Sequence, residues 1–514
     1  MKGVISVLLF ISMFTFKAPA QNKPPLAPSP TIQSNKLKAK VEANPSNLET
    51  HRAFINSFKM DAKFDNPEME MQYKIWIKQF PKEYAIPFAI GEYYVHKEIP
   101  KAAPYLLQAS ILKPDNAEVW DLLANDALFT NNNAMRQNYL NKAVRYAPNN
   151  ADYAFYYANS FKDTDPGRYD SLSLEVARRF PESERGVQAL YWLASNTALS
   201  AEKIAYYKQI YNRKSNQLSD WYLNGTIEYF DLLLQINPEQ AFDFGLTMIL
   251  EGKRNRNLWK DRVKVADTFL KARKFLAEND PKQALALLNQ VDLGNVTLGS
   301  YIIDAKESLA LFKAEAADAA KQTRVAFDTL AVLYSKEPTD GLHAAIYKYG
   351  SKLGMDSNSV AKTIWKIRDS KAKQAADFSL QNYLSGGKST LSDFRGKVIL
   401  LTYWFPGCEP CRAEFPHFES VLKNFNKDKV AYLGLNLFPS QNEFVLPFLK
   451  ETGYTFTPLQ DDQGKAKGNL EASGAPTNYL IDQKGRIVFS GFKIDAENEK
   501  TLELMIRETL AAKD

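Results

Sequence analysis

The spacing of hydrophobic and polar positions changes once along this chain, near residue 376. Over residues 36–370, apolar residues recur at helical spacing, and Asn-Pro, Lys-Pro and Phe-Pro pairs interrupt the pattern. From residue 376, short apolar runs typical of strands alternate with helical stretches. The pattern predicts a multidomain protein, with an all-α region at 36–370 followed by an α/β domain at 376–514.

The second part of the pattern predicts a central sheet that is covered on both faces. Residues 482–485 separate the last two strands and predict a hairpin, because they form a short polar stretch that ends in glycine. Helices are expected near residues 409–427, 442–452 and 496–511. Strands are expected at 376–380, 397–405, 429–438, 477–481 and 486–492.

Prolines recur at a regular interval in the helical region. Pro81, Pro114, Pro148 and Pro181 lie 33, 34 and 33 residues apart, the period of a helix-turn-helix repeat. Here the sequence resembles the tetratricopeptide family, which implies a surface that recruits partners. The alternative is a general helical bundle in which the proline spacing is a coincidence. Between the first two prolines, the family pattern is met by Ile90, Gly91, Tyr94, Ala102, Leu106 and Ala109.

The N-terminus has the features of an export signal. Residues 1–20 combine Lys2, an apolar stretch at 3–16, and small residues before residue 21, which predicts a cleaved signal peptide. The apolar stretch is shorter than the ~20 residues that span a bilayer, so an uncleaved anchor is the weaker alternative. The proline-rich residues 21–35 predict a flexible linker. We therefore expect a periplasmic or otherwise exported protein with no stable membrane insertion after cleavage.

The composition excludes one class of partner. The 514 residues are 45% hydrophobic and 24% charged, as in soluble globular proteins, and the net charge of +6 is spread thinly. Because no long basic block is present, nucleic acid is not an expected partner.

The chain has two cysteines, Cys408 and Cys411, directly after an apolar run at 398–405. A Cys-x-x-Cys pair at the start of a helix places the first sulfur at unsatisfied N–H groups, which favour the thiolate that attacks disulfides. A zinc site would need further ligands, and a structural disulfide would close too small a loop to stabilise a fold much. A peroxidase of the peroxiredoxin type would need a proline and a threonine at fixed spacing upstream of its cysteine, and Pro406 alone does not supply that pattern. No metal or cofactor is expected, because the four histidines are scattered at His51, His96, His343 and His417.

Residues 376–514 resemble the thioredoxin-fold family, and within it the exported TlpA/ResA-like thiol-disulfide oxidoreductases. The matching segments lie at 377–380, 391–397, 408–411, 414–416 and 474–477. The resemblance implies that Cys408 is an exposed nucleophile and that Cys411 resolves the mixed disulfide. It also implies that Pro476 is a cis-proline opposite the cysteines, where the Ala475 backbone binds an extended substrate.

The resemblance gives further side chains a role in the site. Glu414 lies three residues after Cys411 on the same helical face, and the family's matching glutamate lies near the cysteines, which implies a raised pKa and a proton relay. The alternative is an ordinary exposed helix glutamate. Glu409 disfavours the thiolate and so favours a reductant. Trp404, Glu409 and Pro410 are expected on the surface that contacts substrate, since Gly407 replaces the tryptophan usual before the first cysteine.

Together these observations predict an exported protein disulfide reductase whose helical repeats recruit partners. The alternative is an interaction scaffold with a vestigial or merely structural thioredoxin-like domain. The expected partners are exported proteins that contain disulfides and a membrane electron donor, because an exported reductase must be re-reduced from the cytoplasm. Cytochrome maturation is one role of the family among several, and no residue of the sequence identifies the substrate.

Overall fold

The structure is a computed structural model. It describes residues 32–58, 66–162, 164–197, 201–251, 255–291, 293, 305–336, 338–461, 468–470, 472, 474–495 and 498–512. The expected signal peptide and most of the expected linker lie outside the described residues. The first helix begins at Ile32, so the helical region starts earlier than residue 36.

The region before the sheet is helical throughout the residues that the structure describes there, which confirms the predicted fold class of this part. Between α11 and α12 lies the short 3-10 helix η1 (Lys214–Asn216). The helices are α1 (Ile32–Ala43), α2 (Leu48–Asn56), α3 (Pro67–Gln79), α4 (Ala85–His96), α5 (Ala102–Leu112), α6 (Ala117–Phe129), α7 (Asn133–Tyr146), α8 (Ala151–Asn159), α9 (Pro166–Arg179), α10 (Glu184–Asn196), α11 (Ala201–Tyr211), α12 (Asp220–Ile236), α13 (Pro238–Glu251), α14 (Arg256–Ala277), α15 (Pro281–Asn289), α16 (Ala305–Ala319), α17 (Thr323–Tyr334), α18 (Asp340–Lys352) and α19 (Ser357–Lys371).

Local sequence sets where these helices begin. Asn116 and Asn150 each cap a helix by accepting a hydrogen bond from a backbone N–H of the first turn, at 2.9 and 3.1 Å. The helices α4, α6, α8 and α10 start about 33 residues apart, as the proline spacing predicts. Gly91 of α4 lies so close to α5 that a Cβ atom there would be 2.7 Å from Cγ of Leu106. The small residue expected at this close approach is therefore required, while membership of the tetratricopeptide family stays a prediction.

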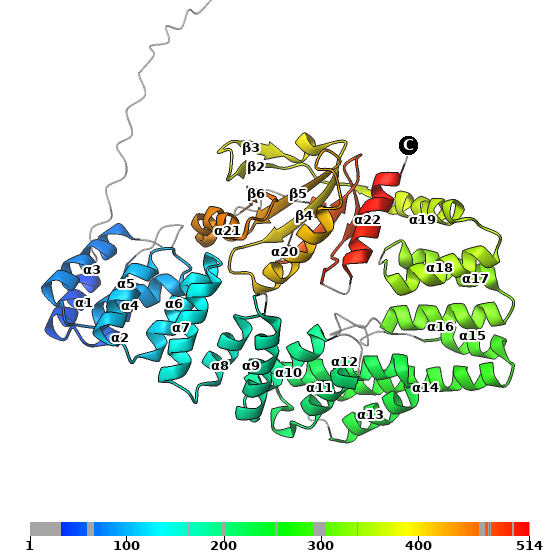
Figure 1. Ribbon diagram of the computed structural model, residues 1–514, viewed down its shortest axis with the longest axis horizontal. Coiled ribbons are helices and arrows are strands. Elements are labelled where there is room, and N and C mark those ends of the chain that lie inside the picture. The colour runs from blue at the N-terminus through cyan, green and yellow to red at the C-terminus, as the bar shows by residue number, and fades with distance from the viewer. Residues whose placement is uncertain are drawn as a thin grey trace, which may run out of the picture.

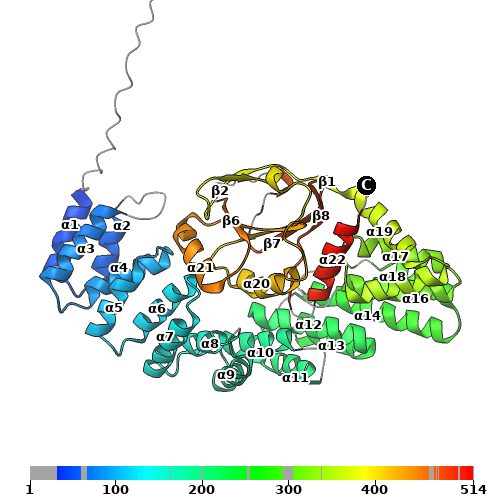
Figure 2. The same cartoon turned by 45° about the horizontal axis from the view of Figure 1, so that its top comes forward.

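The helices form an arc, and the sheet domain lies on its concave side (Figures 1 and 2). The far end of the arc is joined to the domain by partly buried polar contacts. Glu508 near the C-terminus accepts hydrogen bonds from Tyr334, at 3.1 Å, and from Arg368. Arg486 of the sheet pairs with Asp369 of α19 at 2.6 Å. None of the described helices combines the length and apolar character needed to cross a membrane.

One eight-stranded sheet forms the centre of the second domain, with strand order β1-β8-β7-β4-β5-β6-β2-β3. The central strands β4 and β5 are parallel and wholly buried, as their largely apolar sequences predict. The strands β1, β3 and β6 do not appear in the sequence prediction, because they are only two, three and four residues long. The bounds are β1 (Lys373–Gln374), β2 (Ser379–Asn382), β3 (Lys388–Thr390), β4 (Val398–Trp404), β5 (Val430–Asn436), β6 (Thr457–Gln460), β7 (Thr477–Ile481) and β8 (Arg486–Ser490).

Both faces of the sheet are covered, but by different means. The helices α20 (Glu409–Leu422), α21 (Val445–Thr452) and α22 (Glu499–Ala511) pack on the face that carries Leu400 and Trp404. The opposite face is covered by connecting segments and by the 3-10 helices η3 (Leu391–Phe394) and η5 (Gly468–Leu470). A third such helix, η4 (Pro439–Phe444), precedes α21. The predicted hairpin joins β7 to β8, and its Gly485 has a φ of +79°, which favours glycine.

Candidate active site

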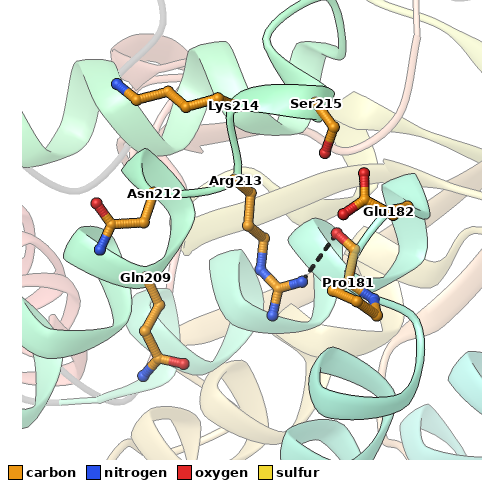
Figure 3. A pocket seen from close by; sticks show the side chains of 7 residues that line it. All are labelled: Pro181, Glu182, Gln209, Asn212, Arg213, Lys214 and Ser215. Carbon is orange, nitrogen blue, oxygen red and sulfur yellow. Dashed lines mark hydrogen bonds between the residues drawn. The ribbon is translucent and has the colours of Figure 1, made fainter.

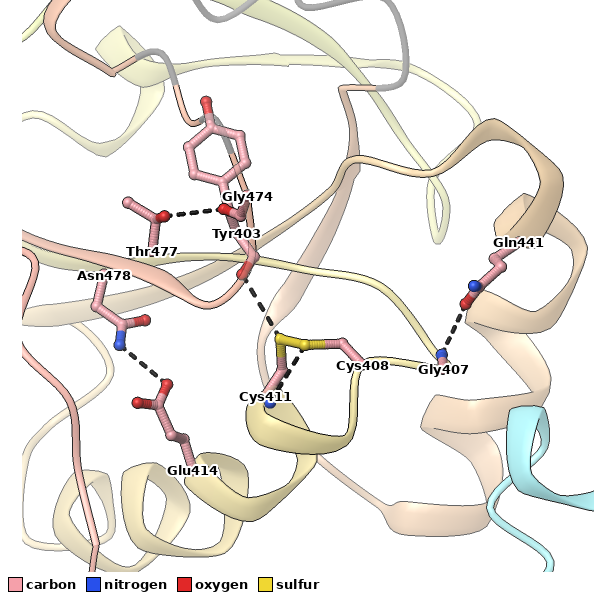
Figure 4. Close-up of a disulfide and its surroundings, with 9 residues drawn as sticks. All are labelled: Tyr403, Gly407, Cys408, Cys411, Glu414, Gln441, Gly474, Thr477 and Asn478. Atoms are coloured by element: carbon pink, nitrogen blue, oxygen red, sulfur yellow. Dashed lines mark hydrogen bonds between the residues drawn. A yellow bond between two sulfur atoms is a disulfide. The ribbon is translucent and has the colours of Figure 1, made fainter. Parts of the chain in front are cut away.

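The two cysteines lie where the central strand β4 gives way to helix α20. Cys408 is the N-cap of α20, and its Sγ accepts a hydrogen bond from the Cys411 N–H at 3.2 Å. The two sulfurs form a disulfide. Once the disulfide is reduced, the N–H groups and the positive end of the helix dipole would stabilise a thiolate on Cys408. The predicted strand-to-helix placement of the pair is therefore confirmed (Figure 4).

The exposure of the cysteines differs from the prediction. Cys408 is only 2% exposed and Cys411 is fully buried, so the expectation of an exposed nucleophile is wrong for this structure. Cys408 packs in the apolar cluster of the sheet domain, and residues of the helical region lie against its two neighbours. Phe129 contacts the Gly407 position, and Asn159 donates a hydrogen bond to Glu409.

Glu414 lies one helical turn beyond Cys411 and is buried, with 4% of its surface exposed. One carboxylate oxygen accepts a hydrogen bond from Asn478 Nδ2 at 2.9 Å, and the other from the Ile494 N–H at 3.3 Å. Burial raises the pKa of Glu414 to about 7, and these hydrogen bonds and Lys493 oppose the rise. The alternative of an ordinary exposed glutamate is therefore wrong, and the carboxyl group can gain or lose a proton near neutral pH.

The segment at 474–477 lies beside the end of β4. Strand β7 begins at Thr477, which pairs with Tyr403, so the preceding residues lie next to the point where the cysteine loop begins. The bond between Ala475 and Pro476 is cis, as the resemblance implies. Ala475 packs against the apolar cluster that contains both cysteines. The role of these two residues in binding substrate stays a prediction.

Comparisons with known proteins agree with this geometry. Residues 372–490 match the model of the AhpC/TSA family. Over 136 residues the chain is 36% identical to the thioredoxin-like protein YneN of Bacillus subtilis, a match that covers 26% of this chain and 78% of that protein. The chain belongs to the thioredoxin-like thiol-disulfide oxidoreductases.

Two further proteins are similar to about a quarter of this chain. The thiol-disulfide oxidoreductase ResA of Geobacillus kaustophilus is 30% identical over 131 residues, which cover 25% of this chain and 74% of that protein. A solved structure of a putative thiol:disulfide interchange protein DsbE from Chlorobium tepidum is 26% identical, with a TM-score of 0.25. That match covers 27% of this chain and 97% of the other.

Trp404 does not belong to the surface of this oxidoreductase. It ends β4 with no exposed surface, and its ring packs at 5.4 Å from Phe415 and 5.0 Å from Phe456 between ring centroids. The expectation that Trp404 contacts substrate is wrong, because the strand continues through this residue and turns its side chain into the core. Glu409 and Pro410 are exposed, and their predicted contact with substrate remains untested.

Two polar residues of the site are absent from the sequence prediction. Asn478 donates through Nδ2 to Glu414 and also, at 2.8 Å, to the Phe492 carbonyl. Gln441 of η4 accepts a hydrogen bond from the Gly407 N–H at 2.6 Å through Oε1. Asn478 has a signal in the sequence, since it is a polar residue in an otherwise apolar strand next to Pro476. Gln441 has none, because it lies in a polar stretch far from the cysteines in sequence.

The histidines and the surface pocket of the described residues do not add to the redox site. Among the residues that the structure describes, no group of His, Cys, Asp and Glu side chains is arranged to hold a metal ion. His417 contacts Glu499 of α22 at 2.7 Å. A small polar pocket lies between the start of α10 and η1 (Figure 3). There Arg213 donates to the Pro181 and Ala177 carbonyls at 3.0 and 2.7 Å, which ties neighbouring helix pairs together.

Proposed function

We propose that this oxidoreductase is an exported reductase of disulfides in other proteins. The observation that carries the proposal is the cysteine pair at the start of α20, with Glu414 buried one turn farther along the helix. Reduced Cys408 attacks a substrate disulfide as a thiolate and forms a mixed disulfide. Cys411 then attacks the Cys408 sulfur and releases the substrate as a thiol, so that two electrons pass from the pair to the substrate.

Glu414 acts in the second step. With a pKa of about 7, its carboxylate accepts the proton that Cys411 must lose before it attacks, and it returns a proton when the pair is reduced again. The buried environment makes this exchange possible near neutral pH, where an exposed glutamate would be fully ionised.

The charge between the cysteines supports the reducing direction. Glu409 places a carboxylate next to the reactive sulfur, which disfavours the Cys408 thiolate and so makes the reduced pair a better electron donor. Asn159 of the helical region donates a hydrogen bond to that carboxylate and holds it beside the helix start.

Export and the partners are inferred from the sequence and from the family. The leader at residues 1–20 supports export, and an exported reductase needs electrons from a membrane donor. The helix pairs of the arc, which repeat about every 33 residues, support a role for tetratricopeptide-like units in recruiting disulfide-containing exported proteins.

The cysteine variants test the redox function. Cys408→Ser abolishes reduction of a protein disulfide, because the attacking sulfur is lost. Cys411→Ser accumulates mixed disulfides, because the resolving sulfur is lost, and non-reducing electrophoresis detects them. Full activity in either variant would contradict the proposal and favour an interaction scaffold with a vestigial redox domain. Mass spectrometry of proteins trapped on Cys411→Ser identifies the partner.

A further inference from the structure

Three parts of the helical arc, at or just after the ends of α4, α6 and α8, lie against the active-site loop at residues 405–408, the first turn of α20 or the neighbouring η4. The turn after α4 brings Glu98, the last residue of α6 is Phe129 and the turn after it brings Asn131, and the end of α8 brings Asn159. Phe129, Asn131 and Asn159 each contact a residue next to one of the cysteines in sequence. Glu98 contacts Gln441 of η4, which holds the loop. We refer to these four residues as the cap.

The turn between α6 and α7 makes the most extensive contact. Arg412, which follows Cys411, donates to the Leu128 carbonyl at 2.5 Å and to the Asn131 side chain. The Phe129 ring lies 4.9 Å from that of Phe444, measured between centroids. Phe129 is itself only 8% exposed, so its ring is held between the two domains.

Gly407 fits this contact because it has no side chain. A Cβ atom at Gly407 would lie 2.6 Å from Cε1 of Phe129, a distance that real Cβ atoms do not tolerate. The family usually has tryptophan at this position, before the first cysteine. In this chain the aromatic ring over the loop therefore comes from the helical region instead.

The turn after α4 supports the same loop indirectly. Gln441 is fully buried, and its Nε2 donates to Glu98 at 2.6 Å while its Oε1 accepts from the Gly407 N–H at 2.6 Å. Glu98 thus orients the amide that fixes the residue before Cys408. Because both the oxygen and the nitrogen of this amide are hydrogen-bonded, the amide holds Glu98 and Gly407 in fixed positions relative to each other.

Two cap residues share the left-handed backbone conformation that recurs at Asn279 and Lys321, in turns between other helix pairs of the arc. Glu98 and Asn131 both have a φ of +55°, in the left-handed region that favours glycine. Each uses its side chain to contact the thioredoxin-like domain, Glu98 through Gln441 and Asn131 through Arg412.

We infer that the α6–α7 turn is part of the active site, and that Phe129 controls which thiols and disulfides reach Cys408. Cys408 is 2% exposed in this arrangement, so a protein partner must displace the cap before its sulfur can meet the Cys408 sulfur. A small thiol needs a smaller displacement of the cap than a protein partner does. The cap therefore selects for partners that engage the helical arc and the active-site loop together.

The test starts from the oxidised full-length protein and measures how fast a reductant reaches Cys408. Reduction begins when a thiolate attacks Cys408 Sγ, breaks the bond to Cys411 and forms a mixed disulfide. A second thiol of the reductant resolves it, which leaves two protein thiols and one oxidised reductant. The chain has two cysteines, and they form this disulfide, so each new thiol comes from this pair. The two probes are reduced thioredoxin, as a protein-sized dithiol, and dithiothreitol, as a small one.

Phe129→Ala should raise the rate of reduction by thioredoxin about tenfold, the factor that corresponds to ~1.4 kcal/mol of lost contact. The rate with dithiothreitol should change by much less. Asn131→Gly should act in the same direction with a smaller effect, since the turn keeps its backbone conformation and loses only one acceptor for Arg412. This variant keeps the test decisive if the loss of Phe129 disturbs folding.

Tyr146→Ala is the matched control, because Tyr146 is an aromatic at the opposite end of α7 and is 43% exposed. It should react like the unaltered protein with both probes. The inference is overturned if Phe129→Ala and Asn131→Gly both match the control with thioredoxin. An equal acceleration with both probes would also overturn it, because that result means a more reactive disulfide rather than easier access. The test does not depend on the direction of the physiological reaction.

Discussion

At the scale of single residues, Glu414 shows how burial turns an ordinary side chain into a proton carrier. Its pKa is about 7 in the folded protein against an ordinary value of 4.5. Between these values the folded state holds a proton that the unfolded state has lost. The contribution of this carboxyl group to the free energy of unfolding therefore falls as pH rises through that window, by a total on the order of 3 kcal/mol.

Glu414→Gln removes this pH dependence, because an amide does not titrate. The stability of the variant relative to the unaltered protein should therefore improve from about pH 5 to about pH 8, which urea unfolding at the two pH values measures. The substitution should also slow turnover and remove the inflection near neutral pH from the pH-rate profile. Glu451→Gln, at an exposed position of α21, is the control and should show neither effect. A stability difference that stays the same at both pH values would contradict the account.

Sequence spacing predicts which residues form the site, but it does not predict what packs around them. The positions of Cys408 and Cys411 and the helical face of Glu414 follow from the sequence, because they depend on local geometry. The burial of Cys408 and Trp404 does not follow, since it depends on what packs against them. Gln441 is missed for the same reason, because it reaches the cysteine loop through the fold and not through sequence proximity.

At the scale of elements, a repeated helix pair is stabilised by the large side chains between neighbouring helices. Trp120 of α6 is 7% exposed, donates through Nε1 to the Pro114 carbonyl at 2.8 Å and stacks on Tyr139 of α7. The Lys142 ammonium lies 3.9 Å from the centre of its ring. The proline that sets the repeat period is therefore fixed directly by the aromatic residue of the next helix.

Trp120→Ala should lower the free energy of unfolding of the helical region by about 3 kcal/mol, because it removes a large buried ring and leaves a cavity. Urea unfolding followed by circular dichroism at a helical wavelength measures this loss. Met135→Ala is the matched control, since Met135 of α7 lines the same surface pocket as Trp120 but is 45% exposed. A loss for Trp120→Ala no larger than that of the control would show that the ring does not hold α6 and α7 together.

The elements that could be predicted are those whose pattern is strong on its own. The apolar runs of β4 and β5 mark buried central strands, and the proline spacing marks the helix pairs. The edge strands β1 and β3 carry no such run, because they are short and no residue in them is buried. They become strands only because a neighbouring strand offers them a ladder of hydrogen bonds.

At the scale of the whole molecule, the helical arc contacts the thioredoxin-like domain at two places. Its far end is fixed through Arg368 and Glu508, and its near turns lie on the active-site loop through Phe129 and Asn131. No sequence pattern predicts these contacts, because the partners lie 140 or more residues apart and none belongs to a shared local motif. The one hint is Gly407, whose departure from the family pattern leaves room for a ring from elsewhere.

The central claim is that Cys408 and Cys411 form a reversible, reducing redox pair. The most direct test equilibrates the full chain with thiol-disulfide buffers of graded potential and counts the free thiols at each point. With Glu409 beside the reactive sulfur, the account predicts a reversible two-electron transition around −250 mV, near thioredoxin at about −270 mV. A transition near −120 mV, the value of a strong oxidant, would contradict the reductase assignment, and a pair that never opens would contradict the redox function itself.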